Sequence, residues 1–221
     1  MCGIAGIVDF SRGGMGPIVE MMSERLVHRG PDMSGTVAFG NCALGHRRLS
    51  ILDLSDSARQ PMLSEDGNTA IVFNGEIYNF LEIRSDLETR GHRFRTNSDT
   101  EVALRSYIEY GDKMLGFFNG MFSLAIWSET DQSLFVARDR LGKKPLYYYM
   151  NGSRLGFASE LYSLISDPEA PRDLDTQAMF EYFMYDFIPA PHTIFRGVMK
   201  LPAAHKALYS PAGFRIERYW S

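Results

Sequence analysis

Apolar and polar positions change their period along the chain, and each period predicts an element. Residues 2–9 form a short, almost wholly apolar run that ends at Asp9, as a buried strand does. Apolar residues with helical spacing then predict a helix over about residues 17–27. Gly30-Pro31 follows, and proline disfavours helical geometry in the residue before it, so the helix has to end there.

The middle of the chain predicts strands and helices in alternating groups. The strands are expected within 36–52, as a pair joined near Gly40, and at 69–73, 121–127, 134–137, 146–149 and 155–158. Two helices have cap signals: Asn79 with Glu82 before one that Gly91 ends, and Ser98 with Glu101 before one that ends near Gly111. This order of strands, helices and strands is typical of an α+β fold with antiparallel sheets, not of a βαβ series.

The sequence pattern changes after Pro168 and Pro171. A helix is predicted over about residues 176–185, and a proline-rich stretch without a predicted strand follows it. We find no internal repeat and no low-complexity segment.

Composition narrows the class of protein. The chain has 221 residues, 45% of them hydrophobic and 23% charged, as in an ordinary globular protein. Its net charge of −4 and its short basic runs argue against nucleic-acid binding. No signal peptide or membrane-spanning apolar stretch is visible, so no membrane contact is expected. Two cysteines, Cys2 and Cys42, are too few for a disulfide framework or a zinc site, and we expect a cytoplasmic protein without a bound metal.

Cys2 is the first candidate for chemistry. An isolated cysteine is most often a small buried hydrophobe, and this interpretation stays open for Cys2. Removal of Met1 would instead place an α-amino group of pKa about 7.7–8.0 on the residue that carries the thiol. Such an amine can act as the general base for its own side chain, so no separate histidine would be needed.

Asn74-Gly75 is the second candidate. Asn-Gly is the strongest hairpin signal, so a plain turn is one interpretation. The other is an oxyanion hole, in which the Asn74 amide and the Gly75 N–H donate to one developing oxygen anion.

Charged residues give weaker signals. Arg47 and Arg48 fit a solvated strand face, but one guanidinium could bind a carboxylate with two hydrogen bonds. Asp99 could stabilise the positive end of a helix dipole or accept a hydrogen bond from a ligand ammonium. His28 could be a catalytic base, although a structural loop around Gly30-Pro31 explains it better.

Taken together, these segments resemble the glutaminase domain of class II (N-terminal nucleophile) glutamine amidotransferases, in its asparagine synthetase branch. The resemblance covers essentially the whole chain. It is carried, in order, by Met-Cys-Gly-Ile-Ala-Gly at 1–6, His-Arg-Gly-Pro-Asp at 28–32, Arg-Leu-Ser-Ile at 48–51, Gln60-Pro61-Met62, Asn-Gly-Glu-Ile-Tyr-Asn at 74–79, Ser-Asp-Thr-Glu at 98–101, Phe118 to Phe122, Arg-Asp-Arg-Leu-Gly at 138–142 and Phe-Ala-Ser-Glu at 157–160.

The resemblance implies a role for each matching residue. Cys2 attacks the side-chain amide of L-glutamine and forms a thioester, while Asn74 and Gly75 form the oxyanion hole. Arg48 binds the α-carboxylate, and Glu76 and Asp99 hold the α-ammonium. The backbone from Leu49 through Ser50 and Ile51 to Leu52 lines the same pocket. The implied fold is the Ntn-hydrolase four-layer αββα sandwich with two antiparallel sheets.

The resemblance also implies what lies outside this chain. Residues 1–221 would be a single glutaminase domain, in which 172–221 resembles the linker to a synthetase domain that activates aspartate. The Ser-Gly-Gly-x-Asp-Ser motif of that domain is absent here, so ATP and magnesium are expected only there and no cofactor is expected in this chain. A fragment of a synthetase and a free-standing ammonia-supplying subunit both fit. A sugar as acceptor, a silent glutamine-sensing domain and a homodimer also stay open.

Overall fold

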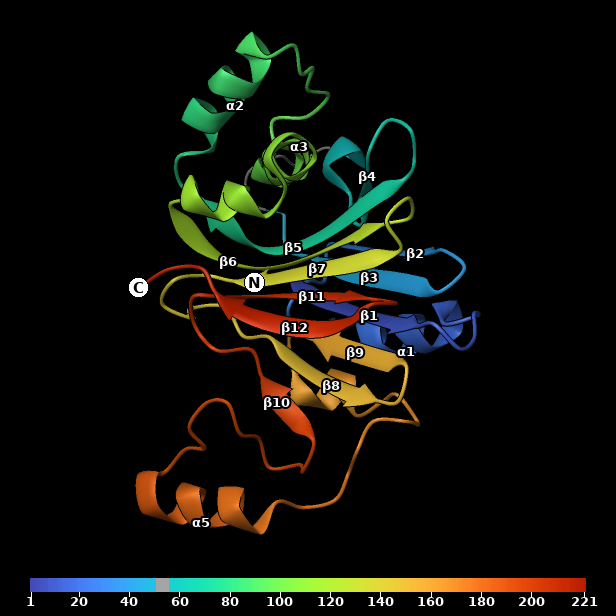
Figure 1. Ribbon diagram of the computed structural model, residues 1–221, viewed down its shortest axis with the longest axis vertical. Helices are drawn as coiled ribbons and strands as arrows, with labels where there is room; N and C mark the ends of the chain where they lie inside the picture. Colours follow the sequence, from blue (N-terminus) through green and yellow to red (C-terminus); the bar gives the residue numbers. More distant parts are fainter. Residues whose placement is uncertain (51–55) are drawn as a thin grey trace.

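The computed structural model describes residues 1–50 and 56–221. Two antiparallel six-stranded sheets lie face to face, and helices cover the outer faces (Figure 1).

The first sheet has β1 near its centre. Its strand order is β10-β8-β9-β1-β3-β2. The strands are β1 (Gly3–Asp9), β2 (Met33–Ala38), β3 (Cys42–Arg48), β8 (Tyr147–Asn151), β9 (Arg154–Ala158) and β10 (Val198–Lys200). Every residue of β1 is buried, as its continuous apolar run predicts, and the strand pairs with β3 on one side and β9 on the other. Cys2 therefore stands at the start of a central strand.

The second sheet has the order β12-β11-β7-β6-β5-β4. Its strands are β4 (Met62–Leu63), β5 (Thr69–Ile77), β6 (Gly120–Ser128), β7 (Ser133–Arg138), β11 (His205–Ser210) and β12 (Gly213–Arg218). The predicted hairpin of β6 and β7 is confirmed.

Of the two interpretations of Asn74-Gly75, the turn is wrong. Strand β5 continues through both residues, with Asn74 opposite Ser123 and Gly75 opposite Phe122 in β6. A Cβ atom on Gly75 would lie 2.4 Å from the carbonyl oxygen of Met121. Glycine is thus needed here for the close approach of two strands, and pairing with β6 overrides the local turn preference.

Three apolar clusters define four layers. One lies between the sheets and joins residues of β1, such as Ile4, to residues of β6, such as Trp127. The second packs the other face of the first sheet against α1 (Gly16–Glu24) and α4 (Leu161–Leu164). The third packs the second sheet against α2 (Phe80–Thr89), α3 (Asp99–Tyr110) and the 3₁₀ turn Gly111–Gly116. The αββα sandwich is therefore confirmed.

The two predicted helix caps have different outcomes. Ser98 caps α3, because its Oγ accepts the N–H of Glu101 at 3.2 Å. Glu101 does not complete the capping box, since its carboxylate accepts the N–H of Thr96 at 2.7 Å. The cap expected from Asn79 is wrong: its side chain donates to the Phe117 carbonyl at 3.0 Å instead of capping α2.

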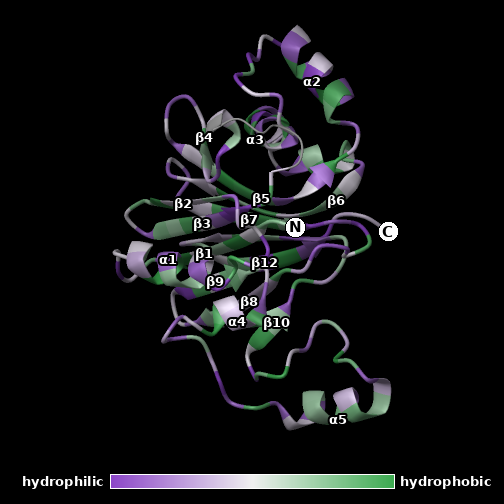
Figure 2. Ribbon diagram, turned by 180° about the vertical axis from the view of Figure 1, so that it is seen from behind, coloured by the Kyte–Doolittle hydropathy of each residue, from purple (hydrophilic) through white to green (hydrophobic). Residues whose placement is uncertain are grey.

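The C-terminal region contributes strands that the sequence analysis did not predict. Strand β10 pairs with β8, and β11 pairs with β7, so this region extends both sheets. The predicted helix at 176–185 is α5 (Thr176–Tyr185), which lies apart from the sandwich (Figure 2). Its Phe180 and Phe183 are 59% and 77% exposed.

Candidate active site

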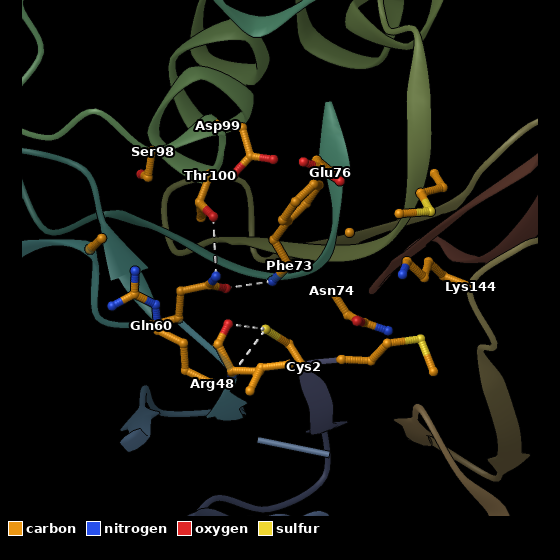
Figure 3. Close-up of a pocket in the computed structure, with 15 residues that line it drawn as sticks. Cys2, Arg48, Gln60, Phe73, Asn74, Glu76, Ser98, Asp99, Thr100 and Lys144 are labelled. Atoms are coloured by element: carbon orange, nitrogen blue, oxygen red, sulfur yellow. Dashed lines mark hydrogen bonds between the residues drawn. The ribbon is translucent and has the colours of Figure 1, made fainter. Parts of the chain in front are cut away.

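A pocket opens where β1, β3, β5 and the N-terminus of α3 meet (Figure 3). Both sheets contribute to it, so it depends on the face-to-face packing. Its lining residues are Met1, Cys2, Arg48, Leu49, Ala58, Gln60, Phe73, Asn74, Gly75, Glu76, Ser98, Asp99, Thr100, Met121 and Lys144.

Cys2 is held from two directions. Its Sγ accepts the N–H of Leu49 at 3.4 Å, and the thiol donates to the Leu49 carbonyl at 3.6 Å. Its own carbonyl accepts Nε of Arg29 at 2.9 Å. Burial raises the pKa of the Cys2 thiol, and the Leu49 hydrogen bond offsets this only in part. The thiol is therefore protonated at neutral pH and needs a base to become a nucleophile.

Asn74 carries a buried amide without a partner. The residue is 1% exposed, and neither Nδ2 nor Oδ1 has a hydrogen-bond partner among the described residues. An unsatisfied buried polar group typically costs about 1–3 kcal/mol, so such a group calls for an explanation. A ligand oxygen in the pocket would supply the missing acceptor for Nδ2.

The main chain of Phe73, directly before Asn74, is fixed by two side chains. The N–H of Phe73 donates to Oε1 of Gln60 at 2.6 Å. Its carbonyl accepts Nε2 of His46 at 3.1 Å. Burial lowers the pKa of His46 to about 3, so the ring is neutral and serves as a structural donor.

Opposite charges occupy different parts of the pocket. Arg48, 6% exposed, has its Nη1 3.4 Å from the sulfur of Met33 as one of its contacts. Asp99 is the first residue of α3, and its Oδ2 accepts the N–H of Ile77 at 3.0 Å. Burial raises the pKa of Asp99 to about 6, and the neighbouring Glu76 carboxylate adds to this. Two acids close together favour a cationic ligand group between them.

The structure brings together most of the predicted site residues. Those that line the pocket are Cys2, Arg48, Leu49, Asn74, Gly75, Glu76 and Asp99. Ser50 does not line it; its N–H donates to Asp32 at 2.8 Å. Ile51 and Leu52 lie outside the described residues. His28 is on the surface, with a 59% exposed side chain that binds Glu160.

Two buried pocket residues were missed. Gln60 entered the sequence analysis only as part of a resembling segment, and Lys144 only as one half of a basic pair too short to form a patch. Both are buried in the folded chain, at 4% and 6% exposed, and line the pocket. Neither residue has a local signal, since only the folded chain brings them to Cys2.

Two other features are absent from the described ranges, 1–50 and 56–221. These residues contain no group of three or more His, Cys, Asp or Glu side chains placed to hold a metal ion. None of the helices there is both long enough and apolar enough to span a bilayer.

The fold and the pocket define a class, a four-layer αββα sandwich with a pocket cysteine directly before a central strand. Residues 1–220 match the sequence family described as the glutamine amidotransferase domain, and the chain belongs to this family. "Asparagine synthetase [glutamine-hydrolyzing] 3" of Bacillus subtilis is 38% identical over 100% of this chain and 37% of its own length. A putative asparagine synthetase of Methanocaldococcus jannaschii is 35% identical over 100% of this chain and 46% of its own length. The chain thus spans less than half of these relatives.

Solved structures support the same fold. Glutamine phosphoribosylpyrophosphate amidotransferase from B. subtilis, complexed with ADP and GMP, superposes with a TM-score of 0.73 and 21% identity, over 99% of this chain and 49% of that one. The allosteric regulatory enzyme of purine biosynthesis gives 0.75 and 20% over the same shares. At this identity the likeness concerns the fold alone.

Proposed function

We propose that this chain hydrolyses L-glutamine to glutamate and ammonia through a thioester on Cys2, after Met1 has been removed. One observation carries the proposal. A cysteine sulfur, a buried amide without a partner, an arginine and two acids line one pocket, so each polar part of glutamine has a partner of matching chemistry. Membership of the glutamine amidotransferase family supports the same substrate.

The freed α-amine of Cys2 takes the proton of the thiol, and Sγ attacks the δ-carbon of the glutamine side chain. Negative charge develops on the carbonyl oxygen, where the Asn74 amide and the Gly75 N–H stabilise it. The intermediate collapses as the amine passes its proton to the departing nitrogen, and ammonia leaves. Water, deprotonated by the same amine, then attacks the thioester carbon; Sγ leaves and recovers its proton, and glutamate is released.

The two ends of the amino acid select the substrate. Arg48 binds the α-carboxylate, and Asp99 with Glu76 binds the α-ammonium. A side-chain amide within a peptide lacks both charges and would not present groups of opposite charge to Arg48, Asp99 and Glu76. Loss of such paired contacts typically costs about 10⁴–10⁵ in selectivity, so free glutamine is strongly preferred.

The released ammonia would serve an acceptor outside this chain. The relatives named above are called glutamine-hydrolysing asparagine synthetases, and they are longer than the region they share with it. This supports delivery of ammonia to a synthetase domain or subunit that amidates aspartate with ATP and magnesium.

Intact mass spectrometry before and after treatment with a glutamine-like diazoketone tests the proposal. The expected result is a protein without Met1 that gains one adduct, mapped to Cys2. Cys42 is an internal control, because it is 1% exposed and burial holds its thiol pKa well above the usual value. Retained Met1, or a protein that stays unlabelled, would overturn the proposal and favour a silent glutamine-sensing domain.

A further inference from the structure

The side chain of Gln60 connects two segments that hold opposite ends of the proposed substrate. Its Oε1 accepts the N–H of Phe73 at 2.6 Å, and its Nε2 donates to Oγ1 of Thr100 at 3.1 Å. Both bonds are buried, and Gln60 itself is 4% exposed. The single amide thus joins strand β5 to the first turn of α3 (Figure 3).

The sheet itself cannot make this connection. Strand β4 pairs with β5 only through Met62 opposite Ile71 and Leu63 opposite Ala70. Within residues 1–50 and 56–221, no strand pairs with this edge of β5 beyond Met62, and the chain bends at Gln60-Pro61. The Gln60 side chain replaces the missing main-chain acceptor for Phe73, so β5 stays hydrogen-bonded on this edge next to the pocket.

Each bond holds a residue next to a binding residue: the first holds the main-chain N–H of Phe73, and the second holds the side-chain hydroxyl of Thr100. Phe73 directly precedes Asn74, which is assigned to the carbonyl oxygen of the scissile amide. Thr100 directly follows Asp99, which is assigned to the α-ammonium. The two hydrogen bonds of the Gln60 side chain therefore connect the position of one subsite to that of the other.

We propose that Gln60 is a positioning residue that sets the distance between the Asn74 subsite and the Asp99 subsite, and so matches the pocket to glutamine instead of its one-methylene-shorter homologue. This inference rests on the proposed function. Reacting groups displaced by about 1 Å can cost about 10²-fold in rate, so a small change in this distance is enough to matter. One methylene is typically worth about 10–200-fold in discrimination.

Two diazoketones that differ by one methylene, one glutamine-like and one asparagine-like, measure this distance directly. The readout is the ratio of their second-order rate constants for labelling Cys2 in the full chain. Gln60→Met keeps a similar side-chain length but loses both hydrogen bonds. Thr100→Val loses only the second bond, whereas Thr100→Ser keeps it. Gln177→Met, on an exposed turn of α5, is the matched control.

We expect the ratio of the glutamine-like to the asparagine-like rate constant to fall at least tenfold in Gln60→Met and in Thr100→Val. It should keep the wild-type value in Thr100→Ser and Gln177→Met. The double variant Gln60→Met/Thr100→Val should fall no further than Gln60→Met, because both changes remove one connection. Melting temperatures identify variants that fail to fold, and Thr100→Val is then the deciding variant.

An unchanged ratio in folded Gln60→Met or Thr100→Val overturns the inference, whether or not the overall labelling rate falls. A merely structural role would slow both reagents equally. The proposed function would survive that result, because wild-type labelling at Cys2 tests it separately. A wild-type protein that neither reagent labels would overturn both.

Discussion

The main chain of Leu49 contacts the sulfur of Cys2 with both of its polar groups, through its N–H at 3.4 Å and its carbonyl at 3.6 Å. Leu49 directly follows Arg48, the last residue of β3. The residue that orients the proposed nucleophile is thus covalently joined to the residue assigned to the substrate carboxylate. The sulfur is oriented by the fold before any substrate arrives.

Replacement of Cys2 by alanine separates binding from chemistry. We expect Cys2→Ala to bind glutamine with near wild-type affinity, because Arg48 and Asp99 are unchanged, and to release no ammonia above background. Calorimetric titration and an ammonia assay measure the two effects. Cys42→Ala, in the buried face of β3, is the control and should stay active. Wild-type ammonia release by Cys2→Ala would show that the nucleophile assignment is wrong.

Replacement of the buried Asn74 amide tests the proposed oxyanion hole. Asn74→Ala should lower kcat by about 10²–10³ with little change in KM, as loss of one oxyanion donor typically does. It should not lower the melting temperature, because the wild-type amide has no hydrogen-bond partner in the described part of the chain. Steady-state kinetics and thermal unfolding check both statements, and a large loss of stability would contradict the assigned role.

The sequence predicted the elements whose pattern is decided locally. The apolar run of β1 and the pattern of the β6 and β7 hairpin are set by residues that are neighbours in the chain, so both elements could be predicted. The sequence left a turn open as one interpretation of Asn74-Gly75, because the strand partner of this segment lies far along the chain. Strands β10 and β11 were missed for the same reason, since they pair with strands formed much earlier, and the prolines around β10, β11 and β12 suggested loops.

The residues of the candidate site also divide into those that the sequence could predict and those that it could not. Residues with distinctive chemistry, such as Cys2, Arg48 and Asp99, could be proposed from their types and the resembling segments. Gln60 and Lys144 could not, because an amide and an ammonium are common surface groups. Only tertiary packing buries them in the pocket.

Ionised Asp99 should lower the free energy of unfolding, although the proposed binding of glutamine requires it. Its pKa of about 6 in the folded protein lies above the ordinary value of 3.8, so ionisation is unfavourable in the native state. This cost is absent below pH 3.8, where both states are protonated, and is complete above about pH 6. Asp99→Asn should therefore be more stable by about 1–3 kcal/mol at pH 7, with no advantage at pH 3.5. Denaturant unfolding at the two pH values measures this difference.

The same group predicts how glutamine binding depends on pH. The α-ammonium requires an ionised Asp99, so KM for glutamine should rise as pH falls below about 6. Asp99→Asn should bind glutamine weakly at every pH and lack this dependence. A wild-type KM that is constant between pH 5 and 7 would place the ammonium elsewhere in the pocket.

Lys144 offers the sharpest matched pair of variants. Its backbone is fixed, because its N–H donates to Asp139 at 3.0 Å and its carbonyl accepts Nε of Arg138 at 2.6 Å. Its side chain lines the pocket, on the other side of Cys2 from Arg48 (Figure 3), and no described residue pairs with its ammonium. A cation near the site of a developing oxyanion stabilises the transition state. Lys144→Met should lower kcat/KM by about tenfold, or about 1.4 kcal/mol. Lys143→Met removes the same charge from an exposed neighbour and should have no effect. Equal kcat/KM values for the two variants would show that the charge of Lys144 does not stabilise the transition state.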